Sequence, residues 1–368
     1  MSSIEVAAHV LVFATGLALV VATLASAIRT MVVPRALPAV IARLVFSGVR
    51  QLLRALGGRS KDYVRRDRAM AYFAPLGLVL LPVVWLTFAL GGYTAMFWGL
   101  GSVSLRNAFI LSGSSLLTLG SDPSSALPEH VLSLTEAACG VGLLALLITY
   151  LPSQYATFNR REVAVALLEV RAGTPPSGPN MIERYHRINW DGGLTQVWKD
   201  WETWFADLEE SHTSLPALSF FRSPRPERSW VTAAGAVLDA ASIRASTMDF
   251  DRDPEAELCV RAGYVALRRI ADFFRISYDP DPQPGDPISV SREEFDDVCA
   301  RLEKVGVALK ANRDQAWRDF AGWRVNYDRV LVELAGLVMA PDAPWSSDRA
   351  TDSRRPPLFA HIPNRLRN

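Results

Sequence analysis

Lysine and cysteine are scarce in this chain of 368 residues, and its charges nearly cancel. Only 4 of the 39 basic residues are lysines, a bias that is typical of a GC-rich bacterial genome. The three cysteines (Cys139, Cys259 and Cys299) form no CxxC pair and no even set, so neither a disulfide framework nor a structural zinc site is expected. A formal net charge of +1 gives no support for a nucleic-acid partner.

Charged residues are missing altogether from three long segments. No Asp, Glu, Lys or Arg occurs in residues 6–28, 69–105 or 137–159, which are 23, 37 and 23 residues long. The hydrocarbon core of a bilayer needs about 20 consecutive apolar residues in a helix. The sequence therefore excludes a wholly soluble protein and predicts three crossings of a lipid bilayer.

The basic residues between the first two apolar segments set the predicted topology. Residues 29–68 hold ten basic and two acidic residues, so the positive-inside rule places this loop in the cytoplasm. The N-terminus is then outside and the C-terminus cytoplasmic, in a multi-pass protein of a bacterial plasma membrane. A cleaved signal peptide is the alternative for the first segment. A retained helix over residues 1–30 is favoured, because Glu5 precedes the apolar run and no basic residue does.

The basic cytoplasmic loop, residues 31–69, contains an amphipathic pattern. Apolar residues recur there at three- and four-residue steps, and Arg43, Arg50 and Arg54 share the opposite face. Such a helix is expected to lie in the headgroup plane, because arginine at the bilayer centre is unfavourable. Packing on the cytosolic domain is the alternative.

Between the second and third crossings lies an apolar stretch too short to cross. Residues 104–117 are mostly apolar and small, which indicates a re-entrant or buried helix. They run into Thr118-Leu119-Gly120-Ser121-Asp122. Non-helical backbone at membrane depth is tolerated only where protein buries it or where it lines a water-filled path. A small-residue helix packed between transmembrane neighbours is the alternative.

The order of these parts resembles the pore module of bacterial two-transmembrane potassium channels. The module would cover residues 70–160, about a quarter of the chain. Its expected parts are an outer helix (71–98), a pore helix (104–117), a filter (118–122) and an inner helix (131–152). The resemblance implies a homotetramer, with potassium ions at the carbonyls of Thr118, Leu119 and Gly120.

The filter departs from the pattern of that family, which reads Thr-Val-Gly-Tyr-Gly-Asp. Thr118, Leu119 and Gly120 match it, with Leu119 standing for the valine. Ser121 stands where an aromatic residue is expected, and either the second glycine is deleted or Asp122 replaces it. If the resemblance holds, the missing ring would have held the filter at a fixed width. We therefore expect a shorter or looser filter that conducts cations without strict selectivity for potassium.

The physical requirement for such a filter is independent of the family. Rings of backbone carbonyls can replace the water shell of a cation. Aiming successive carbonyls inward needs unusual backbone angles, which Gly120 reaches without steric strain and Asp122 tolerates better than most residues. The C-terminal end of the pore helix adds about half a negative charge from its aligned peptide dipoles.

Four further residues are candidates for supporting or opening the pore. Glu136 is embedded in apolar sequence and must find a partner or stay protonated. It either braces the filter through hydrogen bonds to the pore helix or sits at the wet outer end of its own helix. Gly140 and Gly142 would be a hinge or a close-packing surface. Pro152 is expected to end or bend the inner helix near a gate.

The C-terminal half has a helical pattern and contains no motif that indicates a particular chemistry. A helical cytosolic domain is expected over residues 161–340, and a disordered tail over 341–368. No GxGxxG follows a strand and no GxSxG occurs, so neither a nucleotide-binding domain nor an enzyme is indicated. No cofactor is expected beyond the permeating potassium ions, and the sequence identifies no cytosolic ligand.

The sequence as a whole predicts an all-α membrane protein. A potassium-channel-like pore module would be preceded by an extra transmembrane helix and followed by a helical cytosolic domain. We expect a cation channel subunit, of the potassium type, that conducts passively as a tetramer. The alternative is a non-conducting, membrane-anchored scaffold or sensor with a channel-like module.

Overall fold

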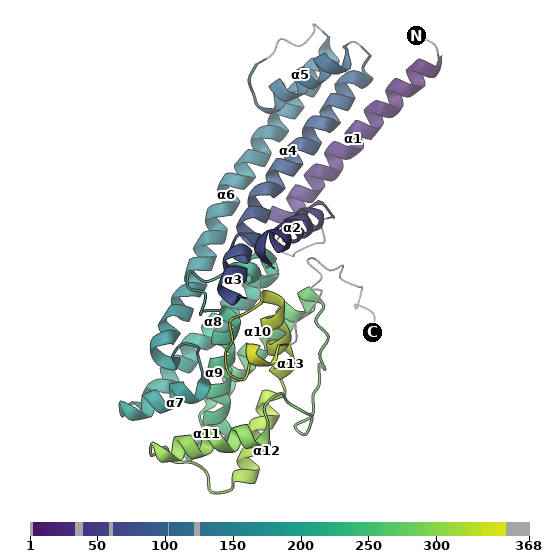
Figure 1. The fold of residues 1–368 in the computed structure, drawn as a ribbon. Helices are drawn as coiled ribbons and strands as arrows, with labels where there is room; N and C mark the ends of the chain where they lie inside the picture. Colours follow the sequence, from purple (N-terminus) through teal and green to yellow (C-terminus); the bar gives the residue numbers. More distant parts are fainter. Residues whose placement is uncertain (1–2, 34–39, 59–61, 102, 121–125, 351–368) are drawn as a thin grey trace. The chain divides into compact units, whose positions relative to one another are not determined.

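The computed structural model describes residues 3–33, 40–58, 62–101, 103–120 and 126–350. Within these ranges the chain is helical, with one isolated bridge between Met248 and Leu309 and no β-strand (Figure 1). The chain divides into two compact units. The apolar unit comprises Met1–Leu53 and Tyr72–Tyr155, and the C-terminal unit comprises Arg54–Ala71 and Ala156–Asn368.

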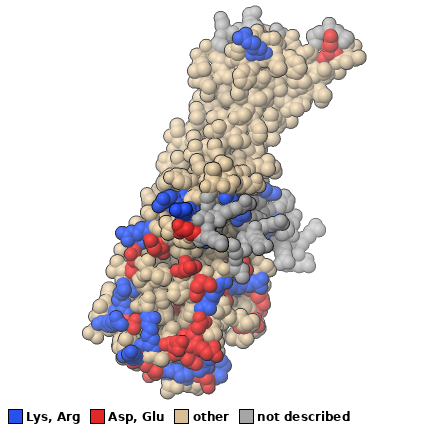
Figure 2. Space-filling view, viewed as in Figure 1, with Lys and Arg blue, Asp and Glu red and all other residues tan. Residues whose placement is uncertain are grey.

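The apolar unit contains the three helices that are long and apolar enough to cross a membrane. Its helices are α1 (Ser3–Met31), α2 (Val40–Leu53), α4 (Phe73–Gly99), α5 (Leu105–Leu116) and the first part of α6 (Leu127–Ala172). Helices α1, α4 and α6 are the candidate membrane spans, the second of them extended by α3 (Tyr63–Ala71). Figure 2 shows their surface as a band without charged side chains. The chain is therefore an all-α, membrane-associated protein, as its charge-free segments predict.

Small residues let α1 and α4 approach closely. A side chain on Gly16 would place its Cβ 2.4 Å from the Gly92 carbonyl oxygen, so the two backbones touch at this crossing. Further along the same pair, the Trp85 indole donates to Ser26 Oγ at 3.2 Å. Transmembrane helices associate through such small-residue contacts and hydrogen bonds, because lipid supplies no hydrophobic drive between them.

Helix α2, the predicted interfacial helix, packs on α4. Phe46 lies over Gly77, where an added Cβ would come within 2.3 Å of its ring, and its ring centroid is 5.8 Å from that of Phe73. The buried face of this helix thus contacts the apolar unit. Val40 and Leu44 remain exposed on its other side.

The C-terminal unit is a bundle of short helices around α9 (Trp230–Ser246). Fifteen of the seventeen residues of α9 are buried, which fits its apolar composition on all sides. The other helices are α3, α7 (Gly178–Arg187), α8 (Leu194–Ser214), α10 (Pro254–Phe274), α11 (Arg292–Lys304), α12 (Arg313–Arg324) and α13 (Asp328–Val338). The shorter turns are η1 (Arg54–Gly58), η2 (Asp191–Gly193), η3 (Pro216–Phe220) and η4 (Ser347–Arg349). Helices α7, α10, α12 and α13 all contact α9.

The predicted disordered tail begins too early. Residues 341–350 carry the turn η4 and pack into the C-terminal unit, with Ala343 and Trp345 buried. The Trp345 ring lies 5.6 Å from that of Phe320, and its carbonyl accepts a hydrogen bond from Arg324. This segment is rich in proline and polar residues, so its composition does not reveal that Trp345 anchors it in the unit. Residues 351–368 of the predicted tail lie outside the described residues.

The inner helix is longer than predicted. Helix α6 begins at Leu127 and continues through Pro152 to Ala172, so this proline does not end it. Proline removes one backbone hydrogen bond from the helix. A neighbouring hydroxyl adds a different bond, in which Ser153 Oγ donates to the Tyr150 carbonyl at 2.7 Å. Helix α6 therefore contributes to both units, up to Tyr155 in the first and from Ala156 in the second.

Candidate functional site

The predicted pore helix forms as α5, between α4 and α6 at one end of the apolar unit (Figure 1). Ser104 begins it, because its side chain accepts a hydrogen bond from the Asn107 backbone N–H at 3.3 Å. At the other end, the N–H of Leu119 returns to the Ser114 carbonyl at 2.8 Å and that of Thr118 to Ser115 at 3.1 Å. This pair of bonds is the Schellman closure of a helix C-terminus.

Thr118 occupies a backbone position that usually requires glycine. Its φ is +55°, in the left-handed region, and a β-branched residue there is strained. Gly120 is also left-handed, with φ +77°, while Leu119 between them is not.

The carbonyl oxygens of Thr118, Leu119 and Gly120 accept no hydrogen bond from the part of the chain that the structure describes. All three residues are exposed in the single chain, Leu119 to 73%. The backbone here thus offers unoccupied acceptors beside the negative end of the α5 dipole. The remaining predicted filter residues, Ser121 and Asp122, lie outside the described residues.

Glu136 lies on α6 against the side of α5. It is fully buried, and its Oε1 lies 2.5 Å from Ser112 Oγ on α5. The same Ser112 oxygen lies 3.0 Å from the Leu90 carbonyl on α4, so three helices meet at one hydroxyl. Of the two positions weighed for Glu136, the wet outer end of its helix is wrong. Its other oxygen, Oε2, has no hydrogen-bond partner among the residues described.

Two more contacts fix α5 to α6. The hydroxyls of Ser115 and Ser133 are 2.6 Å apart, a contact that the sequence did not reveal. About two turns further along α6, a Cβ on Gly140 would lie 2.1 Å from the Leu116 carbonyl oxygen. Gly140 therefore lets the last carbonyl of α5 approach the inner helix closely. Its place in the structure is a packing surface.

The other predicted hinge or gate residues are not joined to this site. Gly142 has no atom within 4 Å of the position where a Cβ would be, and α6 is helical through it. Pro152 lies further along the same helix. Neither residue contacts α5 in the way Gly140 does, so the structure separates the three residues that the sequence grouped.

A buried arginine anchors the far part of α6 inside the C-terminal unit. Arg161 donates to the carbonyls of Leu218 and Phe221, both at 2.8 Å, and to Glu162 at 2.8 Å. It also lies 3.1 Å from Nε2 of His212, whose pKa burial lowers well below its usual value. A neutral His212 can accept that bond.

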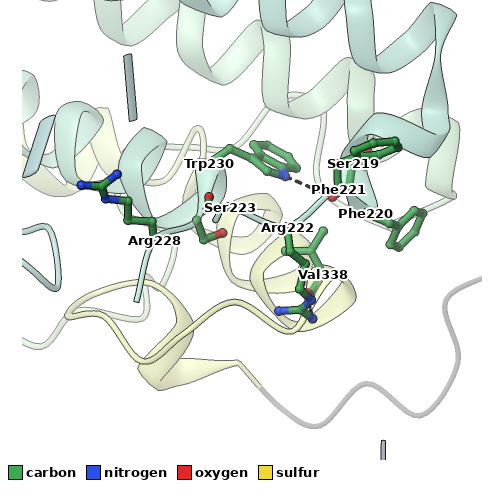
Figure 3. Close-up of a pocket in the computed structure, with 9 residues that line it drawn as sticks. Ser219, Phe220, Phe221, Arg222, Ser223, Arg228, Trp230 and Val338 are labelled. Atoms are coloured by element: carbon green, nitrogen blue, oxygen red, sulfur yellow. Dashed lines mark hydrogen bonds between the residues drawn. The ribbon is translucent and has the colours of Figure 1, made fainter. Parts of the chain in front are cut away.

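The cavity shown in Figure 3 is too small for an organic ligand. It has a volume of about 20 Å³, enough for one water molecule, beside the Trp230 indole that donates to the Ser219 carbonyl at 3.1 Å. The hydroxyls of Ser219 and Ser223 have no partner in the described part of the chain. Such a cavity fits a structural water rather than a reaction.

The carbonyls of residues 118–120, which accept no hydrogen bond from the described residues, lie at the negative end of a short helix, where the helix dipole favours a positive charge. The buried Ser112–Glu136 contact joins that helix to α6. Comparison with protein families, with curated protein sequences and with solved structures finds no match to this chain.

Proposed function

We propose that the chain is a subunit of a cation channel, of the potassium type, in a bacterial plasma membrane. The observation that carries this proposal is the run of carbonyls at Thr118, Leu119 and Gly120 that accept no hydrogen bond from the described residues, directly after a short helix between two candidate membrane spans. A cation that sheds its water needs such carbonyl oxygens at close range.

The contacts around α5 support the proposal physically. A filter must keep its width while ions pass, so the helix behind it must be held rigidly. Ser112 with Glu136, Ser115 with Ser133, and Gly140 beneath the Leu116 carbonyl hold α5 on its neighbours.

Four copies are part of the proposal, because one chain supplies only one side of a ring. Closed rotational symmetry generates a ring of identical carbonyls around an axis. The single chain leaves apolar side chains of α6 uncovered, among them Leu134 and Ile148. Neighbouring subunits and lipid would share this surface. The topology that follows from the basic loop, with the N-terminus outside and the C-terminus cytoplasmic, belongs to the same proposal.

Potassium flux into liposomes tests the function. The purified protein, reconstituted with a potassium gradient, should conduct, and flux should vanish in Thr118→Ala and in Gly120→Val. Valine cannot adopt the left-handed backbone of Gly120 without strain. Reversal potentials in mixed potassium and sodium measure selectivity, and insertion of Tyr-Gly-Asp in place of Ser121-Asp122 should sharpen it. If this change leaves the ion preference of a conducting protein untouched, the argument about Ser121 is wrong.

The scaffold or sensor is the outcome that the same assay can reveal. A correctly folded protein that conducts at no voltage and no pH would be a membrane-anchored module without a pore function. Retention of the native circular dichroism spectrum after reconstitution is the control that separates this result from misfolding.

A further inference from the structure

A second cavity in the C-terminal unit, larger than the one in Figure 3, has no role in the proposed channel. It has a volume of about 230 Å³, below the range for drug-sized ligands and large enough for a small metabolite. The turn after α6, the start of α7, the middle of α9, one face of α11 and the segment before η4 enclose it. The lining residues used below are Ser177, Asn180, Asp239, Val298, Arg301 and Trp345.

A buried carboxylate with one free oxygen faces this cavity. Asp239, on α9, is 2% exposed. Its Oδ1 accepts from the Arg324 guanidinium and from the Tyr327 hydroxyl, the latter at 2.9 Å. Its Oδ2 accepts no hydrogen bond from the residues that the structure describes. Asp239 lines the cavity, so this second carboxylate oxygen is open to a donor from a bound molecule.

The charges around Asp239 do not balance. Arg324 is shared between two carboxylates, Asp239 and Asp328, with its Nε 2.8 Å from Asp328. Asp328 is further satisfied by the N–H and hydroxyl of Ser289, at 2.8 and 2.7 Å. When both acids are ionised, the cluster carries one uncompensated negative charge, and Asp239 is the acid that borders the cavity.

The other polar residues at the cavity do not cancel that charge. Arg301 already pairs with Glu183 at 2.8 Å, a carboxylate that Arg187 shares at 3.3 Å, and it also donates to Asn180. Ser177 is buried, and its hydroxyl makes no capping bond to α7. It remains a second acceptor for a ligand donor. Trp345 also lines the cavity, and its ring lies 5.9 Å from the Arg324 guanidinium carbon.

We propose that this cavity binds a small organic cation that carries N–H donors, of the primary amine or guanidine class. One donor bonds Asp239 Oδ2, and the cationic group neutralises the excess charge of the Arg324 cluster. The inference is independent of ion conduction, since it rests on the C-terminal unit alone. Burial raises the pKa of Asp239 to about 6, while Arg324, Tyr327 and Asp328 are the charged and titratable groups that touch this network. Binding should therefore weaken below about pH 6, as Asp239 takes up a proton.

Calorimetric titration of the full-length protein in detergent at pH 7.5 tests the inference. The probes are n-butylamine and butylguanidine, with n-butanol as a neutral molecule of similar shape. We expect both cations to bind and to raise the unfolding temperature, and n-butanol to do neither. Asp239→Asn should weaken binding about tenfold or more, since it removes the charge and keeps the volume. Asp297→Asn, an exposed acid on α11, is the matched control and should bind as the parent does.

A second variant keeps the test decisive if Asp239→Asn fails to fold. Val298 is half-buried at the cavity, and Val298→Phe fills the space without touching the Arg324 cluster. It should also weaken binding about tenfold or more while the protein stays folded. Equal binding of n-butanol and n-butylamine, undiminished binding in folded Val298→Phe, or no binding of either cation at millimolar concentration would each overturn the proposal.

Discussion

Ser112 Oγ lies 2.5 Å from Glu136 Oε1, in the interior of the apolar unit. The two residues belong to the short helix α5 and to the long helix α6, and the Leu90 carbonyl of α4 lies 3.0 Å from the same hydroxyl. A polar contact in a membrane interior is favourable only when it is well satisfied. This one joins three helices directly behind the proposed filter.

Glu136→Gln and Glu136→Ala should differ sharply. A glutamine amide can donate to Ser112 Oγ, which frees the single hydroxyl hydrogen for the Leu90 carbonyl. We expect Glu136→Gln to keep the parent stability, and Glu136→Ala to lower it by about 1–3 kcal/mol, because it leaves a cavity and removes the partner of Ser112. Thermal unfolding in detergent measures both. Thr135→Ala, on the exposed side of α6, is the control, and equal losses in all three variants would contradict the bracing role.

Thr118→Gly should stabilise the protein, and Thr118→Ala should not. Threonine holds a left-handed backbone with φ +55°, which costs L-residues about 1–2 kcal/mol. Glycine removes this strain but loses more chain entropy on folding, so the net gain is about 1 kcal/mol at most. Alanine keeps the left-handed strain that any L side chain meets. The measurement is the unfolding temperature of the two variants; a glycine variant no more stable than the parent would show that Thr118 is not strained in solution.

Gly140→Ala and Gly142→Ala separate packing from hinge motion. An added methyl at 140 would collide with the Leu116 carbonyl at 2.1 Å, so we expect a loss of about 1–3 kcal/mol. At 142 no atom lies within 4 Å, and alanine should stabilise the helix by up to about 1 kcal/mol. Thermal unfolding measures the stability of each variant, and liposome flux measures its function. Unchanged stability but altered flux in both variants would favour the hinge instead.

Arg161→Ala should destabilise the C-terminal unit far more than Arg160→Ala. The first removes a buried guanidinium from Glu162 and from two carbonyls, a loss of about 3–5 kcal/mol. Arg160 is exposed and pairs only with Asp207 at the surface, a contact worth about 1 kcal/mol or less. Eight of the ten tryptophans lie in the C-terminal unit, so denaturation followed by tryptophan fluorescence reports this difference. Similar losses would mean that Arg161 is not an anchor.

The pH dependence of the unfolding free energy should reveal the raised pKa of Asp239. Because burial raises its pKa from 3.8 to about 6, the folded state binds its proton more tightly than the unfolded state does. Its contribution to stability is therefore full below pH 3.8 and is lost as pH rises to about 6. Arginine contacts lower the pKa of Glu183 and Glu257, which gives the opposite trend.

Comparison with Asp239→Asn isolates that contribution. The difference in unfolding free energy between the parent and this variant should fall by up to about 3 kcal/mol as pH rises from 4 to 6. A difference that stays constant over this range would mean that Asp239 titrates normally.

The sequence predicts the helices well and their contacts poorly, for a physical reason. Charge-free runs as long as 69–105 leave few alternatives to a membrane helix, and the short run at 104–117 marks α5 almost to the residue. Glu136 stands out because a carboxylate is costly in apolar surroundings. Its partner does not, since Ser112 is one of several serines on α5 and only the helix crossing selects it.

Other features depend on long-range packing that no local pattern encodes. Gly140 and Gly142 are equivalent in sequence, and only the approach of the Leu116 carbonyl distinguishes them. Proline usually ends or bends a helix, but α6 continues through Pro152. In the sequence, Arg324 cannot be distinguished from a surface arginine. The fold brings it to Asp239 of α9, which is 85 residues away in the chain.

The most direct test of the account is an electron cryomicroscopy structure of the purified protein in lipid nanodiscs with potassium present. We predict four copies around one axis, with the carbonyls of Thr118, Leu119 and Gly120 facing that axis and density for ions between them. A structure in which these three residues face lipid, or in which the chain has no rotational axis beside α5, would contradict the proposed channel.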